Sequence, residues 1–133
     1  MEERVQQAIA ERLQDEKLSC VAAHDIAGAL GLEPLAVGQA TDRAGRRIFR
    51  CQLGLFGYGL KSEGKHKIVQ AMDSVPEGLS ARLQAAAGPE GITCLDLWQI
   101  ADALGYGRLE ASGAVEALGL RVSRCQLGCF PRP

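Results

Sequence analysis

The sequence has no long apolar run, no export signal and almost no net charge. No stretch approaches the roughly 20 apolar residues that a helix needs to cross a bilayer. The N-terminal segment MEERVQQAIAERLQDEK is acidic and has a helical pattern, unlike a signal peptide. The net charge is −1, so any surface that attracts nucleic acid must be local. We therefore expect a folded, cytoplasmic protein with no membrane partner.

Histidine is scarce, and residues typical of metal or catalytic sites lack the spacing that such sites need. The two histidines, His24 and His66, lie far in sequence from the close pair Cys125 and Cys129. The segment GLFGYG lacks the helix and the Lys-Ser/Thr of a phosphate loop, and no Ser, His and acid set stands out. His24 is expected at the surface, and Trp98 at the joint between units or in a dimer contact. We expect no metal, cofactor or catalytic residue, and therefore no enzyme.

The chain is an internal repeat. Shifted by 74 residues, it aligns with itself without a gap, and 16 of the 37 positions in 20–56 are identical. Ordinary residue frequencies would give about two or three identities. The longest match is RCQLG, at 50–54 and again at 124–128. We infer two copies of one unit, at 1–73 and 74–133, each with its own three-helix core.

Four of the five cysteines recur at this offset, Cys20 with Cys94 and Cys51 with Cys125. One interpretation is a metal or redox site. The other is that they are small buried apolar residues on neighbouring strands. The second is favoured, because the only close pair, Cys125 with Cys129, is not repeated in the first copy. RCQLG is then expected to form a strand and the bend that follows it.

Two helices are predicted in the middle of each unit. CVAAHDIAGALG places apolar residues at i, i+3, i+4 and i+7, which indicates an amphipathic helix, and Gly31 is expected to end it. Pro34 then begins a second helix. Ala27, Gly31 and Val37 have the spacing of a helix-turn-helix motif, which the pair resembles. In the second copy Ala111 replaces the β-branched residue, so the match there is weaker.

Short strands are predicted beside the helix pair, from KLSC and RRIFRCQL in the first copy and from GITC and LRVSRCQL in the second. IVQAM, after a loop rich in Gly and Lys, is a further strand candidate. This order of elements resembles a winged helix. The resemblance implies a mainly α fold with a small β component (α+β), made of two tandem winged-helix-like units, the second lacking a full wing.

A winged helix implies a second motif helix in the major groove and a wing on the DNA backbone. Residues 40–70 carry seven Lys and Arg against two acids, which favours salt-sensitive phosphate contacts. We therefore predict a DNA-binding transcriptional regulator or accessory factor that contacts duplex DNA through the first unit. The predicted DNA-binding residues are Gln39, Arg43, Arg46, Arg47, Arg50, Lys61, Lys65, His66 and Lys67.

The outward positions of the second motif helix argue the other way. They include Glu33 and Asp42, which would repel phosphates, and Gly38, which has no side chain to read a base. Leu35 and Leu109 resemble partner contacts more than base contacts. The alternative is a protein-interaction module or homodimer, in which the apolar stripe of the acidic N-terminal helix seats a partner helix.

Overall fold

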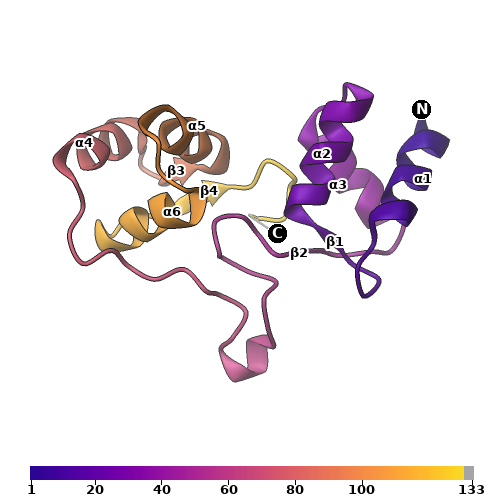
Figure 1. Cartoon of the computed structure of the whole chain (residues 1–133), viewed down its shortest axis with the longest axis horizontal. Helices are drawn as coiled ribbons and strands as arrows, with labels where there is room; N and C mark the ends of the chain where they lie inside the picture. The colour runs from indigo at the N-terminus through magenta and orange to yellow at the C-terminus, as the bar shows by residue number, and fades with distance from the viewer. Residues whose placement is uncertain (131–133) are drawn as a thin grey trace.

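The computed structural model describes residues 1–130, in which helices dominate and the strands are short (Figure 1). The first half contains α1 (Glu2–Arg12), β1 (Leu18–Ser19), α2 (Cys20–Leu30), α3 (Pro34–Arg43) and β2 (Ile48–Phe49). The second half repeats this order with α4 (Glu77–Ala86), β3 (Ile92–Thr93), α5 (Cys94–Leu104), α6 (Arg108–Ala117) and β4 (Val122–Arg124). A short 3₁₀ helix, η1 (Lys61–Glu63), lies in the connection. The predicted combination of helices with a small β component is confirmed.

The predicted ends of the central helices are confirmed as well. Ser19 Oγ accepts a hydrogen bond from the Ala22 N–H at the start of α2, and Thr93 does the same at the start of α5. Gly31 and Gly105, with φ of +66° and +79°, follow the two helices in the left-handed conformation that glycine adopts readily. Within residues 1–130, no single helix is long and apolar enough to cross a bilayer; only α2 and α3 taken together, across a 115° bend, meet that criterion.

The two sheets are minimal and parallel. β1 pairs with β2 through Leu18 and Ile48, and β3 pairs with β4 through Ile92 and Val122. The two helices between the paired strands form the crossover that a parallel pair requires. The predicted IVQAM strand, at 68–72, is wrong, because this segment forms no strand. The strand that would complete a wing is therefore missing from the described part of the first half.

The apolar stripe of α1 is filled from within the protein. Val5 and Ile9 are 3% and 1% exposed, and α1 packs on α2 and α3 of its own half. The predicted seat for a partner helix on this stripe is therefore wrong. Leu79 and Leu83 of α4 are buried in the same way.

The buried side chains of both halves form one continuous apolar cluster. It joins Val37 of α3 and Leu53 from the first half to Trp98, Ala111 and Leu127 from the second. The expected separation into two cores is therefore not observed. Apolar side chains from the two halves lie in one core, so the contact between the halves contributes to its burial.

Candidate functional site

The repeated RCQLG sequence forms the same tight turn twice. The N–H of Gly54 donates to the Cys51 carbonyl at 2.9 Å, and that of Gly128 donates to the Cys125 carbonyl at 3.1 Å. Both glycines have a positive backbone φ, +71° and +80°, a conformation that residues other than glycine rarely adopt. The leucine before each glycine is buried. The prediction of a bend after the strand is confirmed, and its leucine packs inward.

Each turn packs on the third helix of the opposite half. A β-carbon placed on Gly38 of α3 would collide with the backbone of Leu127, and one placed on Gly128 would lie 2.8 Å from Leu35 Cδ1. In the reverse direction, a β-carbon on Gly54 would lie 2.5 Å from Leu109 Cδ1 of α6. In Figure 1 the C-terminal segment after β4 reaches α2 and α3, and the loop after β2 turns back beside α6. Each half thus packs its RCQLG turn on the third helix of the other half, and we call these two the exchanged turns.

This exchange covers part of the surface that was predicted to read DNA. Gly38, predicted to face outward on α3, is buried beneath Leu127. Ser112 and Gly113 of α6 are buried as well. The prediction for Gly38 is wrong, because Leu127 of the opposite half occupies the face of α3 that a major groove would need. Gln39 remains exposed.

A stack of three side chains crosses the boundary between the halves. The rings of His24 and Trp98 have centroids 4.4 Å apart, and the Arg108 guanidinium lies 3.7 Å from the centre of the Trp98 ring. Arg108 also donates to the side-chain oxygen of Gln52 at 3.0 Å. Trp98 is at the joint between the halves, as predicted, whereas His24 is half-buried and not fully at the surface.

His24 makes stability depend on pH. Burial, reinforced by the nearby charge of Arg108, lowers the pKa of His24 to about 4. The unfolded chain binds a proton near pH 6.5, so the stability from neutral His24 is complete above pH 6.5 and is lost as pH falls toward 4. We expect urea unfolding to show falling stability between pH 7 and 5, and a shallower fall in His24→Gln. Equal pH slopes in the two proteins would contradict this role for His24.

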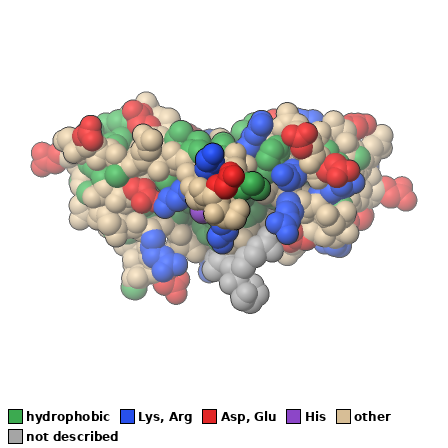
Figure 2. Space-filling view, turned by 90° about the horizontal axis from the view of Figure 1, so that it is seen from below, with side chains coloured by type: hydrophobic (Ala, Val, Ile, Leu, Met, Phe, Trp, Pro, Cys, Tyr) green, Lys and Arg blue, Asp and Glu red, His purple; other side chains and the backbone are tan. Residues whose placement is uncertain are grey.

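A groove of about 830 Å³ lies between the two halves and is built from repeated positions. Four residues of the first half line it together with their repeat mates: Arg47 with Arg121, Ile48 with Val122, Leu55 with Cys129, and Phe56 with Phe130. The rings of Phe56 and Phe130 meet edge to face, with centroids 6.3 Å apart. Figure 2 shows Lys and Arg side chains together with apolar atoms near the middle of this face.

The rim of this groove is cationic. Lys61, His66 and Lys67 from the connection add to the two arginines. Lys67 forms a 2.6 Å ion pair with Glu116, whereas Arg47, Lys61 and Arg121 form no ion pair within residues 1–130. His66 Nδ1 is buried and has no hydrogen-bond partner among the described residues. Positive charge above an apolar floor suits an anionic ligand.

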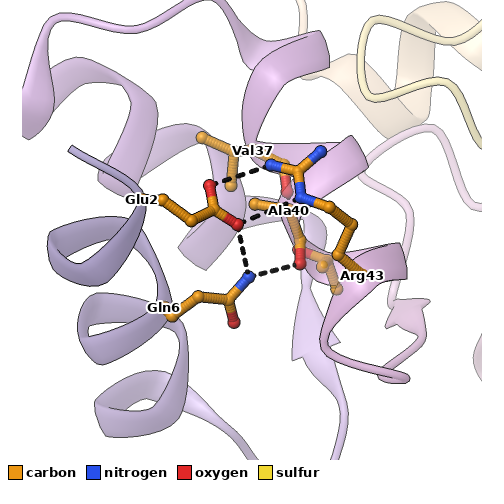
Figure 3. A network of polar contacts seen from close by, with 6 residues as sticks. Glu2, Gln6, Val37, Ala40 and Arg43 are labelled. Carbon is orange, nitrogen blue, oxygen red and sulfur yellow. Dashed lines mark hydrogen bonds and ion pairs between the residues drawn. The ribbon is translucent and has the colours of Figure 1, made fainter.

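The other predicted DNA-binding side chains point elsewhere. Arg43 makes a two-pronged contact with Glu2, at 3.0 and 2.9 Å, and Gln6 ties the same carboxylate to the carbonyl of Ala40 (Figure 3). The remaining three each have a charged or aromatic neighbour: Arg46 lies 4.0 Å from Glu16, Arg50 stacks on Phe49, and Lys65 lies 3.9 Å from Glu63. The structure thus gathers Arg47, Lys61, His66 and Lys67 in one place but disperses the other predicted residues.

The cysteines are packed near the exchanged turns. Cys20 and Cys94 begin α2 and α5, and Cys51 and Cys125 follow β2 and β4, so the predicted placement on strands is wrong. Burial raises the pKa of Cys20 to about 12 and that of Cys94 to about 11, which favours unreactive thiols. A hydrogen bond from Cys129 lowers the pKa of Cys125. Among residues 1–130, no three His, Cys, Asp or Glu side chains gather to hold a metal.

Arg121 and Phe130 are groove residues that the sequence reasoning did not select. The signal for them was present, because the 74-residue offset places Arg121 on Arg47 and Phe130 on Phe56.

Comparison with known proteins found no match to a protein-family model, to a curated protein or to a solved structure.

Proposed function

We propose that the protein is a cytoplasmic, non-catalytic DNA-binding protein whose cationic groove contacts phosphates of the duplex backbone. The observation that carries the proposal is the convergence of Arg47, Lys61 and Arg121 on one rim without acidic partners in the described chain. Phosphate contacts supply affinity and are sensitive to salt, but they carry little sequence information. A role as an accessory factor with weak sequence preference follows.

We further infer that each half derives from the helix-turn-helix class. α2 and α3 meet at 115°, within the usual range for that motif. The parallel pairing of β1 with β2, and the missing third strand, are departures from a winged helix. With Gly38 buried, the proposal assigns phosphate contact to the groove and no base reading to α3.

The test is a salt titration of binding to a duplex of arbitrary sequence. Three phosphate contacts predict a slope of log K against log salt of about −3, since each contributes about 0.9. Arg47→Ala and Arg121→Ala should each reduce the slope by about 1. Arg43→Ala is the matched control, because Arg43 is engaged with Glu2 away from the groove.

Two results would contradict the proposal. One is binding that is absent or independent of salt. The other is an equal loss of slope in Arg43→Ala and Arg47→Ala, which would mean that the groove has no special role.

A protein-interaction function is the second candidate, favoured by a separate observation. Leu35 and Leu95 are each 47% exposed and line a second groove, of about 560 Å³, together with residues of the Cys125–Gly128 turn. Apolar side chains that meet in one concave surface are typical of contact sites between proteins.

A further inference from the structure

The connection between the halves crosses one of the two exchanged turns at residues 67–72, which we call the strap. The N–H groups of Ile68 and Val69 both donate to the carbonyl of Gly54, at 2.8 and 3.2 Å. A β-carbon on Gly54 would lie 3.1 Å from Ile68 Cγ1 and 2.5 Å from Leu109 Cδ1. The strap therefore places a β-branched aliphatic side chain beside the turn and the first part of α6.

We call the glycine carbonyl of the turn and the leucine beside it the seat of the strap. The repeat contains a second copy of this seat. The 74-residue offset places Gly54 on Gly128 and Leu109 on Leu35, and these two residues also meet in the structure. Within residues 1–130, no backbone N–H donates to the carbonyl of Gly128. No counterpart of Ile68 lies within 4 Å of a β-carbon on Gly128 among the described residues. Among the described residues, the second seat thus has the Gly128 carbonyl and the Leu35 side chain without a strap beside them.

The second groove includes this seat. Its lining includes Leu35 and Gly128 together with Thr93, Leu95, Arg124 and Phe130. Leu95 supplies a second exposed aliphatic wall, and the Gly128 carbonyl supplies an acceptor for an incoming backbone. An apolar wall with an open backbone acceptor is the combination by which extended peptides are bound.

We propose that this groove binds an extended segment of a partner protein, with a β-branched aliphatic residue beside Leu35 and two consecutive N–H groups on the Gly128 carbonyl. Neither of the two consecutive residues can be proline, which has no N–H. The occupied seat in the other half supplies the template for this ligand. The proposal does not rest on phosphate binding, which is assigned to the first groove, although Phe130 lines both grooves.

The template applies only to the first part of the strap. Further along, Met72 donates to the carbonyl of Gly113, and a β-carbon on Gly113 would lie 2.5 Å from the carbonyl oxygen of Gln70. The equivalent of Gly113 is Gln39, which carries a long side chain. The partner segment must therefore leave the strap's course at Gln39, so its specificity rests on its first two residues.

The experiment uses the intact chain and a labelled peptide with the strap sequence KHKIVQAMD, followed by fluorescence anisotropy. We expect saturable one-to-one binding that weakens at least tenfold in Leu35→Asp and in Leu95→Asp. A peptide with aspartate in place of its isoleucine should bind at least tenfold more weakly. Leu60→Asp is the control, because Leu60 is 63% exposed and lies outside this groove. Circular dichroism establishes that the variants are folded.

Three outcomes would overturn the proposal. The first is no peptide binding to the folded wild-type chain. The second is binding that is unchanged in both Leu35→Asp and Leu95→Asp, which would put the peptide elsewhere. The third is a wild-type dimer in sedimentation that Leu35→Asp dissociates, which would make a second copy of this chain the occupant.

Discussion

Replacing Gly38 by alanine is expected to destabilise the protein by about 2 kcal/mol, within the range for an overpacked core. The added β-carbon would collide with the carbonyl of Leu127. This is a backbone atom, so it cannot move aside as the end of a side chain can. The collision must outweigh the roughly 1 kcal/mol that alanine gains over glycine inside a helix. Urea unfolding at neutral pH measures the change.

Gly28→Ala is the matched control. Gly28 also lies inside a helix, α2, but a β-carbon there would meet no atom within 4 Å. The same chemical change should therefore stabilise the protein by about 0.5–1 kcal/mol. Opposite signs for the two substitutions would identify the contact between the halves as the cause. Stabilisation by both would mean that Leu127 does not lie on α3 in solution.

Truncating the leucine of either exchanged turn should have the largest effect of all. Leu53 is fully buried and Leu127 is 3% exposed, so Leu→Ala at each should cost about 2–5 kcal/mol through lost burial and the cavity left behind. The measurement is again the midpoint and slope of urea unfolding. Leu60→Ala should change stability by less than about 0.5 kcal/mol, because Leu60 is a surface residue.

A near-neutral Leu127→Ala would contradict this expectation. A large loss for Leu53 with none for Leu127 would show that only one turn supports the core. The repeat predicts instead that both turns matter, because each contributes its leucine to the same apolar cluster.

Local features of the fold could be predicted because they depend on local chemistry. Gly31 ends α2 in the left-handed conformation, and Pro34 begins α3; both follow from backbone preferences of single residues. The shared order of elements follows from the identities at a fixed offset. These signals need no knowledge of which parts of the chain meet.

The packing between the halves could not be predicted from the sequence in the same way. The spacing of the helix-turn-helix motif assigned Gly38 to the outward face of α3, and nothing in the neighbouring sequence indicates that Leu127 covers it. The segment 68–72 has the composition of a strand, yet Ile68 and Val69 share one carbonyl instead of following a partner strand. Contacts between residues distant in sequence decided both cases.

The candidate site was predicted in part for a related reason. Arg46 and Arg47 are adjacent in the basic segment, but Arg46 lies near Glu16 and Arg47 lines the groove. Clustering in sequence therefore overstated clustering in space. Arg121 was missed because the second copy has few basic residues nearby, although its offset from Arg47 marks it.

The central claim is that each half is completed by the turn of the other. Amide hydrogen exchange in the folded Leu127→Ala variant tests it most directly, because slow exchange reports local opening. The account predicts that protection falls in α3, residues 34–43 of the first half, although the substitution is in the second. Loss of protection confined to residues 77–130, with α3 unchanged, would contradict it.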